Sequence, residues 1–326
     1  MSSINTNASA MQALQSLNMT NKKMDAVQNA ISTGLSVGSA KDNAAYWSIA
    51  TEMRSDNKAL GTVKDALGLG AAKVDTATTG LTAAIDVADE IKTKLVAARE
   101  PGVDRDAINT EITALKEQLL TIAQSSSFSG ENWLQNDGAT AATDKSIVGS
   151  FNRSAAGNVS VSTIDITVSD ITLVGADNES LGILTKDYDA NQLLDTPLTG
   201  VGVENEFRLL DMGTGATTGE DGAVVGVSSS TSDADIDSMI SVVDAIISDM
   251  TSAASGLGSV GKRVDMQSDF VDNLMNSIEK GIGQLVDADM NEESVKLQAL
   301  QVQQQLGVQA LSIANGQSQS ILSLFR

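Results

Sequence analysis

The sequence of 326 residues contains no cysteine and no histidine. Without cysteine the chain can form no disulfide, no thiol nucleophile and no cysteine-ligated metal site. Without histidine it lacks the general base of Ser-His-Asp and Cys-His catalysis and the usual ligand of zinc enzymes. These absences exclude most hydrolases and metalloenzymes, and we expect no catalytic residue, no cofactor and no metal.

Basic residues, aromatic residues and prolines are also scarce. The chain has 21 Lys and Arg against 42 Asp and Glu, which gives a net charge of −21, and it has only 3% aromatic residues and two prolines. Nucleic-acid binding and docking on anionic membranes both depend on basic patches. No apolar run approaches the ~18 residues of a membrane-spanning helix, and the first residues do not form a Sec-type signal. We therefore expect neither nucleic acid nor a membrane as a partner.

The apolar residues that are present follow a repeat of alternating three- and four-residue steps. From Tyr46 to Ala98 fourteen of sixteen such positions are apolar, and from Ile236 to Leu285 thirteen of fifteen are. A shorter seam runs over residues 108–122. This repeat is the signature of long helices packed along one another. A helix over residues 46–98 spans about 80 Å at ~1.5 Å per residue, so these segments predict an elongated rod and not a globule.

Local signals mark the ends of these helices. Ser232 with Asp235 three residues later predicts a capping box in front of the 236 helix. Pro101 and Gly102 end the 46–98 helix, and Asp104 can cap the next one.

The middle of the chain differs from the two ends in charge, glycine content and apolar pattern. Residues 131–230 carry a net charge of −11 and 12 of the 27 glycines. Apolar residues alternate with polar ones over residues 159–173, which predicts strands separated by glycine turns. The predicted fold is therefore mainly α, with heptad-patterned helices from both chain ends and a β-rich outer domain inserted between them.

Both chain ends carry apolar stripes at helical spacing, over residues 4–35 and 295–324. A wide apolar arc needs another surface to bury it, and a slim rod cannot enclose both ends, so we expect contacts between subunits. The expected polymer contacts are Ile4, Met11, Leu14, Leu17, Met24, Ile31, Val295, Ala299, Val302, Leu306, Ile313 and Ile321.

Two segments give a family resemblance. Residues 31–50 read ISTGLSVGSAKDNAAYWSIA, and residues 287–294 read DADMNEES before a helix that ends in SILSLFR. Together with the opening SINTN and Phe128-Ser-Gly, they resemble the two ends of bacterial flagellins. The Tyr46-Trp47 pair, where most flagellins have small residues, resembles the alphaproteobacterial branch.

The resemblance implies a subunit that polymerises with itself into the flagellar filament. Residues 1–45 and 287–326 would form an inner coiled-coil layer, 46–137 and 232–286 a helical core, and 138–231 a variable outer domain. It also implies export of the unfolded chain to the cell exterior. The implied partners are an export chaperone on the C-terminal helix, the filament cap and the hook-junction proteins.

The resemblance also supplies positions for an immune-receptor epitope. Flagellins sensed by the Toll-like flagellin receptor present an Arg, a Leu four residues later and a Glu on the next helix. Leu95 and Glu111 match this pattern, but Ile91 stands where the family has the Arg. We expect poor recognition.

The alternative to a filament subunit is a hook-filament junction protein, which shares the terminal helices. An enzyme in the insert is disfavoured, because the chain has no His, no Cys and no G-x-S-x-G motif around the serines of the insert. A surface adhesin on the same scaffold is compatible with a filament subunit. Acidic clusters at residues 187–189 and 233–237 lack EF-hand spacing and fit solvated faces or helix N-termini better than calcium sites.

Overall fold

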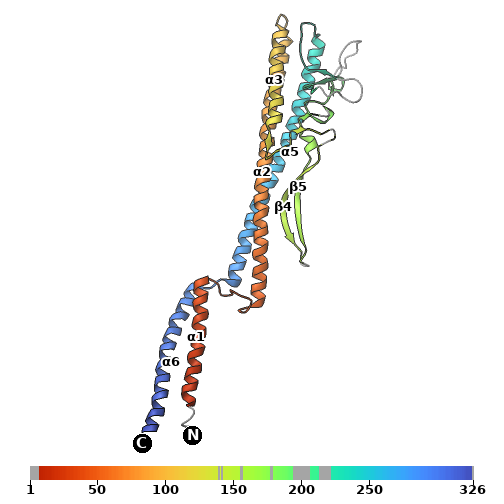
Figure 1. The fold of residues 1–326 in the computed structure, drawn as a ribbon. Helices are drawn as coiled ribbons and strands as arrows, with labels where there is room; N and C mark the ends of the chain where they lie inside the picture. The colour runs from red at the N-terminus through yellow and green to blue at the C-terminus, as the bar shows by residue number, and fades with distance from the viewer. Residues whose placement is uncertain are drawn as a thin grey trace. The chain divides into compact units, whose positions relative to one another are not determined.

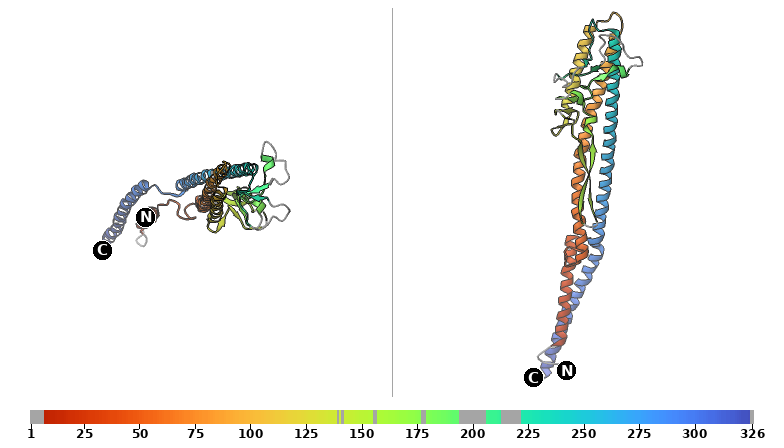
Figure 2. Two further views of the ribbon diagram at one scale, coloured as in Figure 1. Left: turned by 90° about the horizontal axis from the view of Figure 1, so that it is seen from above. Right: turned by 90° about the vertical axis from the view of Figure 1, so that its right-hand side faces the viewer.

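The computed structural model describes residues 7–138, 140, 142–154, 157–176, 179–193, 206–212 and 222–324 (Figures 1 and 2). Side chains are described up to residue 316, with the exception of Glu179. Contacts divide the chain into two compact units. Unit 1 comprises Met1–Ala59 and Asn273–Arg326, and unit 2 comprises Leu60–Asp272.

Helices dominate both chain ends. The long helices are α1 (Ala8–Thr33), α2 (Ala44–Ala98), α3 (Arg105–Ser125), α5 (Asp233–Val286) and α6 (Met290–Leu324). The middle of the chain holds the short helix α4 (Ala190–Leu193), two 3-10 turns, η1 (Val168–Asp170) and η2 (Glu179–Leu181), and the strands. The strands are β1 (Ser127–Phe128), β2 (Glu131–Asn132), β3 (Gln135–Asn136), β4 (Lys145–Arg153), β5 (Val159–Ile166), β6 (Val174–Gly175), β7 (Tyr188–Asp189), β8 (Glu206–Arg208) and β9 (Ala223–Val224). The predicted fold class is confirmed: long helices form both chain ends, and the middle of the chain contains the strands.

In unit 2 the later part of α2 runs antiparallel to the first part of α5. Ion pairs join Lys64 to Asp272 at 2.7 Å and Arg99 to Asp237 at 2.9 Å, and Lys92 pairs with Asp244 between them. Each step forward along α2 is matched by an equal step back along α5, as two straight helices in contact require. Repeat positions of α2 along this stretch are buried: Leu60, Val63, Leu67, Val74, Ala77, Leu81, Ala84, Ala88, Ile91, Leu95 and Ala98.

The predicted helix caps are confirmed. Asp104 accepts hydrogen bonds from the backbone N–H groups of Asp106 and Ala107. Ser232 and Asp235 form the reciprocal capping box, with side-chain to backbone distances of 3.1 and 3.2 Å. Both caps satisfy N–H groups that a helix leaves without an intrahelical partner.

The guanidinium of Arg105 links the turn regions at this end of unit 2. It donates to the carbonyls of Ala98 at 3.1 Å and Thr231 at 2.6 Å, and it pairs with the Asp233 carboxylate at 2.6 Å. Arg105 therefore joins the end of α2 to the start of α5. This arrangement also lowers the pKa of Asp233, chiefly through the Arg105 hydrogen bond and the charge of Arg99.

The strands of unit 2 form small sheets on one side of the helices (Figure 2). Strands β4 and β5 pair antiparallel, with Ile147 opposite Ile164 and an irregularity between Val148 and Ser150. Strand β3 pairs parallel with β6, and β7, β8 and β9 form a three-stranded sheet. Ile147, Ile164 and Ile166 are buried, whereas Val159 and Val161 at the start of β5 are exposed. The predicted alternation over 159–173 therefore has a buried apolar side only in the second half of β5, and the chain continues after it as the 3-10 turn η1 and not as a strand.

The middle segment packs directly on the helices. A Cβ added at Gly70 of α2 would lie 2.4 Å from Cγ2 of Ile147 on β4, so only glycine permits this approach. On α3, the Lys116 ammonium donates to the carbonyl of Val225, and burial lowers the pKa of Lys116 to about 8 despite the nearby Asp211. Contacts therefore group the middle with the helices of unit 2. The separate outer domain over residues 138–231 stays a prediction.

Gly70→Ala should destabilise unit 2 by roughly 1–3 kcal/mol, because the new methyl group overlaps the buried Ile147 side chain. Gly68→Ala, two residues away on the same helix, is the matched control. Nothing lies within 4 Å of a Cβ at Gly68, so it should stabilise by about 0.5–1 kcal/mol through helix propensity. Thermal unfolding of the two variants measures both shifts, and equal shifts would contradict the close approach.

In unit 1 the loop between α1 and α2 packs against the last turns of α5. Gly34 ends α1 in the left-handed region, with a φ of 74°, and the N–H groups of Ser36 and Val37 donate to the carbonyl of Val286. Val37, Ala50, Ile282 and Val286 form a small buried cluster, flanked by Leu35, Met53, Ile278 and Leu285. This cluster is the apolar core of unit 1 near the loop.

The predicted repeat of α2 departs from the structure at its first two positions. Tyr46 and Ile49 belong to the predicted repeat but are exposed, at 46% and 47%, because Ala50 supplies the inward-facing side chain there.

Among the described residues one helix, α5, is long and apolar enough to cross a membrane by length and composition alone. The core helix of a protein that spans no membrane passes the same test, and the inward positions of α5, such as Val243, Met250 and Leu257, are buried in unit 2.

Candidate polymer contacts

The terminal helices α1 and α6 lie side by side in unit 1 (Figure 1). The α6 residues that are buried or half-buried recur at alternating spacings of four and three: Glu293, Leu297, Leu300, Gln304, Gly307, Leu311 and Ala314. Leu17 of α1 packs on Gly307, with its Cδ1 atom 3.3 Å from where a Cβ would lie. Two hydrogen bonds of 2.9 Å add to this contact, from Asn7 to the carbonyl of Ala314 and from Gln304 to Asn21. This seam is the contact of α6 within the chain.

The sequence-predicted contacts on α6 lie on a different face. We call the residues Val295, Ala299, Val302, Leu306 and Ile313 the α6 stripe. All five are exposed, with Val295 at 67%, Val302 at 54% and Ile313 at 70%. At 100° per residue the stripe lies nearly opposite the seam that faces α1. The described part of unit 1 therefore leaves this stripe uncovered.

The predicted contacts on α1 divide between two environments. Met11 and Leu14 are exposed, at 59% and 48%, whereas Leu17, Met24 and Ile31 are half-buried. Leu17 belongs to the seam between the two helices, so it already has a partner within the chain. Ile4 lies outside the described residues. Ile321 belongs to the α6 backbone, but its side chain lies outside the described ones.

Two more exposed apolar residues lie on these helices, of which the apolar pattern of the sequence included Val308 but not Met19. Met19 on α1 is 54% exposed, and Val308 on α6 is 53% exposed. Val308 and Leu311 line an open groove between α1 and α6, together with Met11 and Leu14. The groove could not be predicted, because it depends on which faces of the two helices meet.

The α6 stripe is also free of charge. Residues 297–325 contain no Asp, Glu, Lys or Arg, although the whole chain carries −21. The nearest basic residue, Lys296, pairs with Glu293 at 2.8 Å and Glu292 at 3.0 Å, and these contacts raise the pKa of Lys296. Two copies can therefore approach along this helix without the repulsion that their net charges produce elsewhere.

The receptor-epitope positions lie in unit 2 and differ in how exposed they are. Ile91 and Leu95 are fully buried, at 0% exposure, in the helix core of unit 2. Glu111 is exposed and pairs with Lys94 at 2.6 Å, which raises the pKa of Lys94. The described surface at this place includes the paired Lys94 and Glu111 and the exposed Val96, and the matched Leu95 does not contribute to it.

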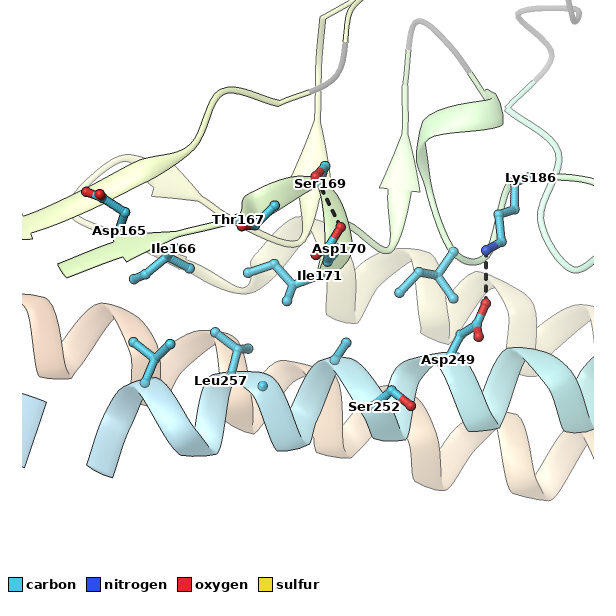
Figure 3. Close-up of a pocket in the computed structure, with 14 residues that line it drawn as sticks. Asp165, Ile166, Thr167, Ser169, Asp170, Ile171, Lys186, Asp249, Ser252 and Leu257 are labelled. Atoms are coloured by element: carbon cyan, nitrogen blue, oxygen red, sulfur yellow. Dashed lines mark hydrogen bonds and ion pairs between the residues drawn. The ribbon is translucent and has the colours of Figure 1, made fainter. Parts of the chain in front are cut away.

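Unit 2 has a groove between the β5–η1 segment and α5 (Figure 3). The Oδ2 atom of Asp249 accepts hydrogen bonds from Lys186 at 2.9 Å and from the Tyr188 hydroxyl at 2.8 Å, so this oxygen already has partners within the chain. Burial raises the pKa of Tyr188, which keeps this hydroxyl protonated. In the described part of the chain no three acidic residues gather as a metal site.

The fold and the surface together define a class: a helical structural subunit whose paired chain ends expose an uncharged apolar stripe. Comparison with known families agrees. The bacterial flagellin N-terminal helical region matches residues 4–139, and the bacterial flagellin C-terminal helical region matches residues 240–325. The chain belongs to the bacterial flagellin family.

Relatives match over their full length. The chain is 53% identical over 329 residues to Flagellin C of Rhizobium meliloti strain 1021, with 100% of both chains covered. It is 45% identical over 395 residues to Flagellin A of Rhizobium meliloti and 41% identical over 327 residues to the flagellin of Brucella melitensis, again with complete coverage. The resemblance to the alphaproteobacterial branch is confirmed. The chain is a structural subunit of the flagellar filament and not an enzyme.

Proposed function

We propose that the chain polymerises through the α6 stripe, together with Met11 and Leu14 of α1. The observation that carries this proposal is the exposure of Val295, Val302 and Ile313 on an uncharged helix face opposite the seam with α1. Burying such side chains contributes about 25 cal/mol per Å² of apolar surface removed from water. A contact repeated on every copy therefore favours a continuous filament.

The finer division of the chain follows from the same proposal. Residues 1–45 and 287–326 form the inner layer of the filament, 46–137 and 232–286 its helical core, and 138–231 the outer surface. The charge distribution supports this order, because residues 131–230 carry −11 whereas residues 297–325 carry no charge. Charge favours the solvent, and an uncharged apolar helix favours the interior.

The proposed route to the filament is export of the chain to the cell exterior before assembly. An export chaperone would cover the C-terminal helix, because its apolar stripe is exposed in the free subunit. The filament cap and the hook-junction proteins would contact the chain at the two ends of the polymer. Neither nucleic acid nor a membrane has a role in this proposal.

Recognition by the Toll-like flagellin receptor should be poor. Leu95 and Ile91 are buried, so neither side chain is available to a partner of the folded subunit. Glu111 is the matched position that remains exposed, and it is already paired with Lys94.

Polymerisation of the purified chain tests the proposed function. The chain alone should extend short filament seeds into long filaments, seen by electron microscopy, at subunit concentrations where unseeded solutions stay clear. A junction protein would add only a few subunits to each seed and then stop. Growth that stops in this way would contradict the proposed function and favour the junction alternative.

A further inference from the structure

The first two turns of α2 are unusual for a helix in a folded unit. Asn43 caps them, with its side-chain oxygen accepting from the N–H groups of Ala45 at 3.1 Å and Tyr46 at 3.2 Å. Residues 44–49 are all exposed, including Tyr46 at 46% and Trp47 at 37%. The helix therefore begins with side chains in solvent on every side.

These exposed residues are apolar apart from Ser48, and none of them is charged. Residues 43–51 read NAAYWSIAT and contain no Asp, Glu, Lys or Arg. A helix that is apolar all round is ordinarily buried, and a polar one is ordinarily exposed. The chain has only nine aromatic residues, two of them Trp, and two of these nine lie side by side in this exposed turn. We call Tyr46, Trp47 and Ile49 the aromatic patch.

The core of unit 1 does not account for the aromatic patch. Ala50, at 1% exposure, and the half-buried Met53 are the α2 residues that pack with Val37, Ile282 and Val286. Ala50 directly follows the patch and supplies the inward contact of this turn. The side chains of Tyr46 and Trp47 are therefore not part of the buried cluster through which α2 packs in unit 1.

We propose that the aromatic patch is an anchor that inserts into a second copy of this chain during assembly. The inference rests on the proposed function, because it needs a polymer in which copies touch. A second copy is the occupant that the proposed polymer supplies, and because the patch carries no charge, two subunits of −21 each meet there with less repulsion than elsewhere. The patch lies in unit 1, which also bears the uncharged α6 stripe. Large aromatic side chains in a fully desolvated contact are the usual hot spots of protein interfaces.

The tryptophan content of the chain makes this contact directly measurable. The second tryptophan, Trp133, is buried at 4% exposure in unit 2. In a Trp133→Phe background, Trp47 is the sole tryptophan and reports on its own surroundings. Its fluorescence in the free subunit should be that of a partly exposed indole and should be quenched by acrylamide. On seeded polymerisation the emission should move to shorter wavelength, and the quenching constant should fall at least about fivefold.

Substitutions test whether the contact also contributes to assembly. Trp47→Ala should raise the critical concentration for seeded growth at least about tenfold, as expected for a hot spot, while Trp47→Phe should retain most of the assembly. Phe270→Ala is the matched control, because Phe270 is a 56% exposed aromatic residue of α5 outside the patch. Thermal unfolding of each free subunit is measured alongside to show that the variants fold, because Phe270 is 56% exposed but Trp47 only 37%; for Trp47→Phe and Phe270→Ala it should stay near that of the parent.

The outcomes separate this inference from the proposed function. Long filaments in which Trp47 remains as accessible to acrylamide as in the subunit would overturn the inference and leave the filament function intact. Failure of the parent chain to form filaments would overturn both. Equal critical concentrations for Trp47→Ala and Phe270→Ala would also overturn the anchor.

Discussion

Val302→Asp should abolish polymerisation while leaving the free subunit folded. Val302 is 54% exposed and belongs to the α6 stripe, so its substitution in the subunit falls in the range of ordinary surface changes, within about 0.5 kcal/mol. In a filament that buries the stripe, the same change places a carboxylate in an apolar contact. This costs several kcal/mol on every copy unless the group is protonated or paired. A repeated penalty of that size prevents growth.

The matched control for this variant is Gln301→Asp. Gln301 is the preceding residue of α6 and is exposed, but its 100° rotation takes it off the stripe. It adds the same charge to the same helix. Seeded growth and thermal unfolding should show a polymerising Gln301→Asp, a non-polymerising Val302→Asp and near-equal unfolding temperatures. Normal filaments from Val302→Asp would mean that the stripe is not buried in the polymer.

Ile91→Arg should unfold or strongly destabilise unit 2. Residue 91 is where the family resemblance places the receptor-binding Arg, and the resemblance alone suggests that restoring it would gain recognition. Ile91 is instead fully buried in the helix core. A guanidinium there stays charged and loses its hydration, which is among the most costly single substitutions. We expect a loss of roughly 3 kcal/mol or more, measured by chemical denaturation.

Glu90→Arg separates the effect of charge from the effect of burial. Glu90 directly precedes Ile91 on α2 and is exposed, so the same guanidinium remains hydrated there. Its unfolding free energy should stay within about 1 kcal/mol of the parent. An Ile91→Arg subunit as stable as Glu90→Arg would show that residue 91 faces solvent, and would return the receptor alignment to consideration.

Patterns within a helix were predictable from the sequence. The 3-4 repeat predicted helices over 46–98 and 236–285, and the structure has Ala44–Ala98 and Asp233–Val286. The repeat also includes Ile91 and Leu95 and thereby predicted their burial. The family resemblance placed the same two residues at a receptor face. The periodicity reports directly on which side of the helix meets its neighbour, and the receptor positions stay a prediction.

The sequence did not predict which apolar face of a helix packs within the chain and which one stays exposed. Both Val302 and Leu300 lie on apolar stripes of α6, yet Leu300 is buried on the seam with α1 and Val302 is exposed. The arc is apolar on more than one side, so spacing alone cannot say which side pairs within the chain. The same holds for the start of α2, where the repeat counted Tyr46 as a seam residue and the structure exposes it.

The arrangement of the middle segment depends on partners far apart in sequence. The parallel pair of β3 and β6 joins Gln135 to Val174, and Lys116 of α3 donates to Val225. Arg208 is 4% exposed and lies 3.8 Å from the Asp187 carboxylate. Each of these contacts forms only when a long loop of the chain closes, and no local sequence pattern predicts which residues then meet.

Cysteine labelling along α6 tests the central claim most directly, because the natural chain contains no cysteine to interfere. Val302→Cys and Gln301→Cys would each be reacted with a maleimide, first as free subunits and then in seeded filaments. Both should react quickly in the subunit, where both positions are exposed. If the α6 stripe forms the polymer contact, the rate at residue 302 should fall at least about tenfold in the filament and by more than the rate at residue 301. A residue 302 that reacts as fast in the filament as in the subunit would contradict the account.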